Sequence, residues 1–122
     1  MNEARMDKYL TIADLKECAR RRVPKMFFDY ADSGAWTEGT YRANEEDFQK
    51  IKLRQRVLVD MTNRSLKATM VGQEVSMPVA LAPTGLTGMQ HADGEMLAAQ
   101  AAEEFGVPFT LSTMSICSIE DV

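Results

Sequence analysis

The chain has 122 residues, of which 45% are hydrophobic and 26% charged, and its formal net charge at pH 7 is −4. This composition is typical of a soluble globular protein that is long enough for one domain. A net negative chain without a basic tract excludes nucleic acid as a partner, because binding to a phosphate backbone needs clustered Lys and Arg. No stretch approaches the roughly 18 consecutive apolar residues of a membrane helix, so we predict a cytoplasmic protein.

The cysteines and the single histidine give no metal-binding pattern. Cys18 and Cys117 lie far apart in the sequence, and we expect both to be reduced thiols. His91 is the only histidine, which excludes a histidine-based metal cluster within these residues. We therefore predict no metal site.

The first part of the chain, about residues 9–50, predicts three helices. Thr11 and Asp14 have the spacing of a capping box, with the shorter acid in place of Glu, ahead of apolar residues at helical spacing. A second short helix is expected over 25–32, and a polar surface helix over 37–48.

A change of period then predicts strands. Apolar and polar residues alternate over about 64–77, and Gly72-Gln73 supplies a turn, which together indicate a β-hairpin. The continuous apolar run that follows, 78–83, is typical of a strand buried on both faces, as in a parallel sheet.

The last part of the chain repeats the strand-helix order. Asp93 is placed to cap a helix over 93–105, a second short buried strand is expected over 108–112, and 118–121 is typical of the first turn of another helix. This βαβα order builds parallel sheets, and a complete (βα)₈ barrel takes about 200 residues or more. The predicted fold class is therefore α/β: residues 1–122 form the N-terminal part of a (βα)₈ barrel, which is incomplete in this chain and is preceded by the helical segment and the hairpin.

Two segments with hydroxyl side chains follow the two predicted barrel strands. Pro83, Thr84 and Gly85 end the first strand, and Ser112 ends the second, 28 residues after Thr84. Ligands of βα folds lie beyond the carboxyl ends of the strands, so these residues are candidates for binding a planar, electron-rich cofactor. The alternative is that they are ordinary turn residues, and the pattern alone leaves both interpretations open.

Four motifs, in this order, carry a family resemblance: PKMFFDY at 24–30 with SGA at 33–35, SMPVALAPTGLTG at 76–88, HADGE at 91–95, and TLSTMSICSIEDV at 110–122. From about residue 9 to the end, the chain resembles the FMN-dependent 2-hydroxy acid dehydrogenase and oxidase family. The resemblance implies FMN at the carboxyl ends of the barrel strands. It also implies oxidation of a lactate-like L-2-hydroxy acid to the 2-oxo acid, with hydride transfer to flavin N5.

The resemblance assigns roles to matched positions. Tyr30 matches the tyrosine that donates its hydroxyl to the substrate carboxylate, for which a neutral phenol is suited because no charge has to be buried. Pro83, Thr84 and Gly85 match the segment that lines the flavin, although family members often carry alanine at the position of Gly85. Ser112 matches a serine that contacts the flavin from the second strand.

The resemblance also implies what lies elsewhere. The catalytic histidine, the substrate-binding arginines and the phosphate-binding loops of the family belong to later strands, and His91 does not match that histidine. We therefore expect this chain alone to be inactive and to bind FMN weakly or not at all. Met114 stands where glycolate-oxidising members carry tryptophan, which favours a larger substrate such as lactate. Family barrels commonly form homo-tetramers, and some bacterial members attach to membranes through a later insertion.

Two other functions fit parts of the pattern. Another FMN barrel, such as a type 2 isopentenyl diphosphate isomerase, would share the strands, but the position of Tyr30 favours hydroxy acid chemistry. A non-catalytic binding module built from the opening of a barrel is the second alternative. The sequence does not choose between dehydrogenase and oxidase.

Overall fold

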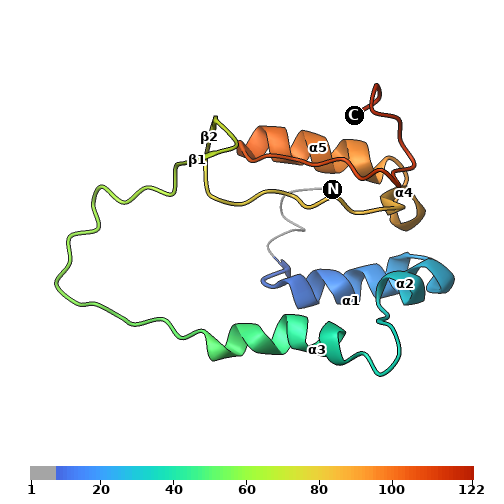
Figure 1. The fold of residues 1–122 in the computed structure, drawn as a ribbon, viewed down its shortest axis with the longest axis horizontal. Coiled ribbons are helices and arrows are strands. Elements are labelled where there is room, and N and C mark those ends of the chain that lie inside the picture. The colour runs from blue at the N-terminus through green and yellow to red at the C-terminus, as the bar shows by residue number, and fades with distance from the viewer. Residues whose placement is uncertain (1–7) are drawn as a thin grey trace.

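The computed structural model describes residues 8–122, and its N-terminal part is helical (Figure 1). Helices α1 (Ile12–Arg22), α2 (Lys25–Ala31) and α3 (Gly39–Glu46) follow one another, and the 3₁₀ helix η2 (Asp47–Lys50) extends α3. All four elements lie within the predicted helical segment.

The capping box predicted at the start of α1 is confirmed. The Thr11 hydroxyl accepts a hydrogen bond from the backbone N–H of Asp14 at 3.2 Å, and the Asp14 carboxylate accepts one from the N–H of Thr11 at 2.9 Å. These two bonds satisfy backbone donors that have no partner within the helix. The helix therefore begins where its local sequence predicts.

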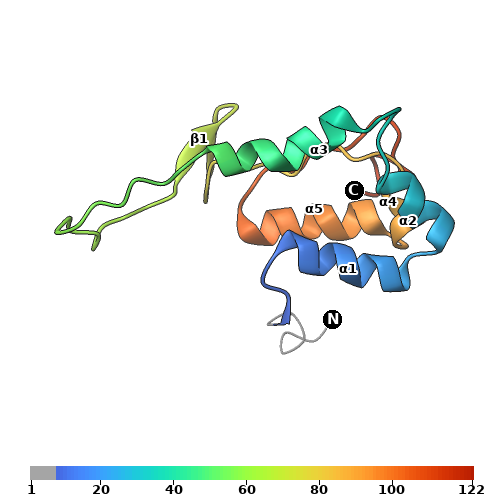
Figure 2. The same ribbon diagram turned by 90° about the horizontal axis from the view of Figure 1, so that it is seen from below.

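An extended segment, residues 51–67, leads to the hairpin and projects away from the helices in both views (Figures 1 and 2). Strands β1 (Ala68–Met70) and β2 (Gln73–Val75) pair antiparallel. The turn consists of Val71 and Gly72, with φ angles of 50° and 80°, one residue earlier than predicted. Both residues of a type I′ turn need positive φ, and Gly72 adopts it without steric cost. Gln73 belongs to the strand, where it pairs with Met70.

The two predicted barrel strands lie side by side and parallel, but they form less than a full ladder. Leu81 and Phe109 make one parallel bridge, in which the N–H of Leu81 donates to the Pro108 carbonyl at 2.8 Å and the N–H of Thr110 to the Leu81 carbonyl at 3.2 Å. In this register the next donors would be the backbone nitrogens of Pro83 and Pro108, and proline has no N–H to donate. The prolines therefore limit the ladder at both ends.

Two helices complete the βα units. Helix α4 (Thr87–Gln90), which the sequence did not predict, spans only four residues, too short for an apolar period to show. Helix α5 (Gly94–Phe105) lies where a helix was expected. Asp93 holds the N-cap position, but its φ of 56° differs from the extended backbone of a capping residue, and its side chain makes no cap hydrogen bond. The expected capping by this side chain was therefore wrong.

At the end of the chain, 118–121 forms a turn in place of the predicted first turn of a helix. The Asp121 N–H donates to the Ser118 carbonyl at 3.2 Å, and the Ser118 hydroxyl donates to the Asp121 carboxylate at 2.7 Å.

Little of the apolar surface is covered. Val75 and Ala102 are the only buried hydrophobic residues in the described part of the chain. The accessible surface is 10858 Å², whereas a compact monomer of this mass exposes roughly 6,600 Å². The described elements therefore form an open layer whose apolar faces are exposed.

Candidate functional site

The segments that follow the paired strands keep one register. The bridge joins Leu81 to Phe109, 28 residues apart, and the N–H of Leu86 donates to the carbonyl of Met114, again 28 residues apart, at 2.9 Å. We call residues 83–86 and 112–114 the rim. The carboxyl ends of both strands therefore lie at one edge, where the sequence placed the candidate site.

Gly85 and Ser112 meet at the rim. A Cβ atom added at Gly85 would lie 3.5 Å from the Ser112 Oγ and 3.1 Å from the Met114 Cβ. The Ser112 Oγ accepts a hydrogen bond from the Met114 N–H at 3.1 Å, which leaves its own O–H to donate to a ligand. The Thr84 hydroxyl reaches the Ala82 carbonyl at 3.3 Å. The structure thus brings together the strand-end residues that the sequence singled out.

One residue at this edge was missed by the sequence reasoning. Glu95, in the first turn of α5, is 2% exposed. Its Oε1 accepts hydrogen bonds from the N–H groups of Gly88 at 3.2 Å and Ile116 at 3.1 Å, and its Oε2 accepts one from the Cys117 thiol at 3.4 Å. One sequence signal for its burial was present: Glu95 lies seven residues before Ala102, on the same face of α5, and Ala102 is buried.

The Glu95 carboxyl is held in its ionised form. The Ile116 N–H is the main cause that lowers its pKa, and burial, which acts in the opposite direction, is outweighed. Backbone N–H donors and the N-terminal end of α5 thus compensate the charge. Residues 68–122 contain no Lys or Arg that could do so.

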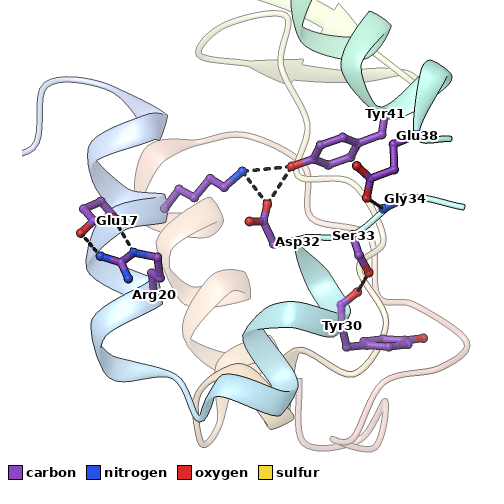
Figure 3. Close-up of polar contacts among 9 residues, drawn as sticks. Glu17, Arg20, Tyr30, Asp32, Ser33, Gly34, Glu38 and Tyr41 are labelled. Atoms are coloured by element: carbon purple, nitrogen blue, oxygen red, sulfur yellow. Dashed lines mark hydrogen bonds and ion pairs between the residues drawn. The ribbon is translucent and has the colours of Figure 1, made fainter. Parts of the chain in front are cut away.

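A polar cluster fixes α2 relative to its neighbours (Figure 3). The Lys16 ammonium on α1 lies 2.5 Å from the Asp32 carboxylate at the end of α2 and donates to the Tyr41 hydroxyl on α3 at 3.0 Å. The Tyr41 hydroxyl in turn donates to Asp32 at 2.8 Å. Three helices are therefore joined at one point, which sets the direction of α2.

Tyr30, the predicted substrate ligand, lies on α2. Its ring points away from the polar cluster (Figure 3), and the residue is 71% exposed. Within residues 8–122 no hydrogen bond joins its hydroxyl to the rim. Helix α2 nevertheless packs on α4, directly after the rim, where the Gln90 amide donates to the Phe27 carbonyl at 2.9 Å. Helix α2, which carries Tyr30, thus lies at the same end of the molecule as α4 (Figure 1).

The rim residues fit the ring system of FMN, and the part of the chain that carries them has no cationic side chain for its phosphate. A flat ring needs small side chains and hydrogen-bond donors beside it, and Gly85, Thr84 and Ser112 supply these. A phosphate is usually held by Arg, Lys or a helix N-terminus, and residues 68–122 contain seven acidic residues and no Lys or Arg.

The described residues form neither a metal-binding cluster nor a membrane-spanning helix. Among residues 8–122, no group of three or more His, Cys, Asp or Glu side chains could hold a metal ion. In the same part of the chain, none of the helices combines the length and apolar character needed to cross a bilayer.

Comparison with known proteins gives a family. A family model described as FMN-dependent dehydrogenase matches residues 19–122. The L-lactate dehydrogenase of Xanthobacter autotrophicus is 54% identical over 110 residues, which is 90% of this chain and 28% of that protein. The L-lactate dehydrogenase of Acinetobacter baylyi is 51% identical over 109 residues, which is 89% of this chain and 28% of that protein. The chain thus spans under a third of the length of these relatives.

Solved structures of similar proteins support the same family. A soluble mutant of the membrane-associated (S)-mandelate dehydrogenase from Pseudomonas putida matches with a TM-score of 0.85 at 41% identity, covering 90% of this chain and 32% of that one. A mandelate oxidase matches with a TM-score of 0.88 at 33% identity, covering 93% and 32%. The fold class and the cofactor predicted from the sequence are confirmed. The chain belongs to the FMN-dependent dehydrogenase family and forms the N-terminal part of its (βα)₈ barrel.

Proposed function

We propose that this chain is part of an FMN-dependent enzyme that oxidises an L-2-hydroxy acid, L-lactate above all, to the 2-oxo acid. The observation that carries the proposal is the approach of Gly85 to Ser112, because it opens a small, hydroxyl-bearing surface at the carboxyl ends of two parallel strands. A planar cofactor needs such a surface, and the family to which the chain belongs uses FMN.

The site residues keep their proposed roles. FMN, when bound, takes up the two electrons that leave the substrate. Gly85 allows the backbone to approach the ring, Pro83 supplies an apolar wall, and the hydroxyls of Thr84 and Ser112 supply polar contacts. Tyr30 donates its phenol O–H to the substrate carboxylate and so orients the substrate. A neutral donor does this without the cost of burying a second charge.

Lactate is favoured over a bulkier acid by the relatives. The two L-lactate dehydrogenases named above are 51% and 54% identical to this chain, whereas the mandelate dehydrogenase and the mandelate oxidase are 41% and 33% identical. Family membership and the position of Tyr30 also favour hydroxy acid oxidation over the isomerase alternative. Met114, at the rim beside Gly85, is the residue through which we expect the chain to contact the substrate side chain.

We also propose that the complete enzyme is a cytoplasmic homo-oligomer, a tetramer by family resemblance. One structural neighbour is described as a monotopic membrane protein, (S)-mandelate dehydrogenase, so the test has to include the membrane fraction. Cell fractionation should recover the enzyme without detergent, and light scattering on a sizing column should give four times the protomer mass. Recovery with the membranes would contradict the cytoplasmic location.

The catalytic proposal is tested in a hybrid enzyme. In this hybrid, the present chain replaces the matching segment of the L-lactate dehydrogenase of Xanthobacter autotrophicus. A mutant of an active chimera of (S)-mandelate dehydrogenase is among the similar structures, so at least one chimera of that enzyme is active. We expect anaerobic L-lactate to bleach the flavin absorbance of the hybrid and D-lactate to leave it unchanged. A hybrid that binds FMN and does not react with L-lactate would contradict the proposed function.

A further inference from the structure

Glu95 closes the register of the two loops that carry the rim. Residues joined across these loops are 28 apart at each step: Leu81 with Phe109, Leu86 with Met114, and Gly88 with Ile116. The first two pairs are joined by direct backbone contacts. At the third step two N–H donors face one acceptor, the Glu95 Oε1, which takes both hydrogen bonds. Glu95 thus holds together two loops that have no direct bond there.

The position is costly for a carboxylate. Glu95 is 2% exposed, and among the ion pairs of the described residues none involves it. An unpaired buried charge disfavours folding unless polar groups compensate it fully. The buried Ala102 on the same face of α5 shows that an apolar side chain suits this stripe. A carboxylate here is therefore explained by the backbone groups that it binds.

Glu95 also lies close to the first rim segment. It lines a cavity of about 220 Å³ together with Thr84 and Thr87. The Thr87 hydroxyl, at the start of α4, donates to the Thr84 carbonyl at 3.0 Å. A shift of the Gly88 N–H away from Glu95 would therefore move α4 and, through Thr87, the carbonyl of Thr84.

We propose that Glu95 is a positioning residue for FMN binding: by accepting the N–H groups of Gly88 and Ile116, it holds Thr84, Gly85 and Ser112 in one surface. This inference rests on the proposed function, because it assumes that the rim faces the flavin. Glu95 acts only through the loops, and it contacts neither cofactor nor substrate.

Four variants of the FMN-loaded hybrid enzyme test the proposal. Glu95→Ala removes the acceptor, and Glu95→Gln keeps an oxygen for both N–H groups while losing the charge. Glu103→Gln repeats the charge loss at an exposed position of α5. Val75→Ala removes a buried side chain of the hairpin and serves as a control for simple loss of stability. The dissociation constant of FMN is measured by flavin fluorescence, at a temperature at which circular dichroism shows every variant to be folded.

We expect Glu95→Ala to raise the FMN Kd about tenfold or more, because two part-buried N–H groups on the loops lose their shared acceptor. The Kd of the other three variants should stay within about threefold of the parent value. Hydrogen exchange at the Gly88 and Ile116 amides should become faster in Glu95→Ala only. An unchanged Kd in Glu95→Ala, or an equal rise in Val75→Ala, would overturn the proposal.

The result that would refute the proposed function differs from the result that would refute the role of Glu95. A parent hybrid that binds FMN without reacting with L-lactate refutes the activity, while the Kd comparison still decides the role of Glu95. A parent hybrid that takes up no FMN would overturn the placement of flavin against the rim, and with it the role of Glu95. An effect in Glu95→Ala together with normal lactate oxidation by the parent supports both.

Discussion

The proposed role of Tyr30 depends on one hydroxyl group. Tyr30 is 71% exposed and accessible to a substrate, while α2 is fixed by the cluster of Lys16, Asp32 and Tyr41. In the hybrid enzyme we expect Tyr30→Phe to raise the KM for L-lactate about tenfold or more, because a hydrogen bond to a charged group is lost. Steady-state kinetics measure this change.

Tyr41→Phe is the matched control for Tyr30→Phe. Like Tyr30→Phe, it removes one phenol hydroxyl, here the one that belongs to the polar cluster. The ion pair between Lys16 and Asp32 stays in place, so the KM should stay within about twofold. An equal rise in KM for both variants would show that Tyr30 acts through the position of α2 and not through contact with substrate.

Gly88 tests how closely the two loops must pack. A Cβ atom there would lie 2.8 Å from the Ile116 Cβ and 2.9 Å from its Cγ1. We expect Gly88→Ala to lower the free energy of unfolding of the hybrid by about 1–3 kcal/mol, as overpacking does. Thermal unfolding followed by circular dichroism measures it.

Two further variants make the test of Gly88 specific. Gly39→Ala, at a site with nothing within 4 Å of the added Cβ, should leave the melting temperature unchanged or raise it. Adding Ile116→Ala to Gly88→Ala removes the contacts with the two Cγ atoms of Ile116 and leaves the one with its Cβ, so it should restore only part of the lost stability. A melting temperature unaffected by Gly88→Ala alone would contradict the close packing of these loops.

At the scale of elements, the sequence predicted correctly those features whose physical cause lies in neighbouring residues. The capping box of α1 was predicted because its donors and acceptors lie within four residues of chain. The parallel pairing of 78–83 with 108–112 was predicted from apolar runs separated by a helix. The short ladder was not, because the effect of Pro83 and Pro108 depends on the register, which only the structure gives.

In the candidate site, too, some features could be predicted from the sequence and others could not. The common edge of Thr84 and Ser112 followed from the length of one βα unit, which is a property of the sequence. The hydrogen bonds of Glu95 join groups up to 22 residues away, so no local sequence pattern predicts them. The helix dipole alone explains an acidic residue in the first turn of a helix, so there was no reason to expect from the sequence that Glu95 also binds the loops.

Helix α1 carries a charge cluster that should respond to acid. Arg20 donates two hydrogen bonds of 2.7 Å to Glu17, and this contact is the main cause that lowers the pKa of Glu17 to about 2. A carboxyl whose pKa is lowered on folding stabilises the fold above its ordinary pKa of 4.5, and this contribution is lost as the pH falls toward 2.

We expect the Glu17 carboxyl resonance of the chain to titrate near 2 in NMR spectra. The stability advantage of the parent over Glu17→Gln should shrink as the pH is lowered through this range. The cluster is exposed, so about 1 M salt should reduce the advantage at neutral pH as well. Titration of Glu17 near its ordinary value would show that the cluster does not persist in solution.

The whole molecule is an open layer. Large apolar side chains such as Trp36, Leu53 and Leu58 are almost fully exposed, and the accessible surface exceeds that of a compact monomer by more than half. The segment 51–67 projects from the body without packing against it (Figure 2). A layer of this kind depends on further protein to cover its faces, which agrees with a chain that spans 28% of its relatives.

The distribution of charge predicts how the chain alone binds flavins. All 14 Lys and Arg residues lie within residues 1–67, so the part of the chain that carries the rim offers no cation to a phosphate. We expect the chain alone to bind FMN with a Kd weaker than about 100 µM. Its affinity for riboflavin, which lacks the phosphate, should agree within about threefold, whereas the hybrid should prefer FMN strongly. Absorbance titrations of both proteins with both flavins measure this. Micromolar FMN binding by the chain alone, or a clear preference for FMN over riboflavin, would mean that residues outside the rim already form a phosphate site.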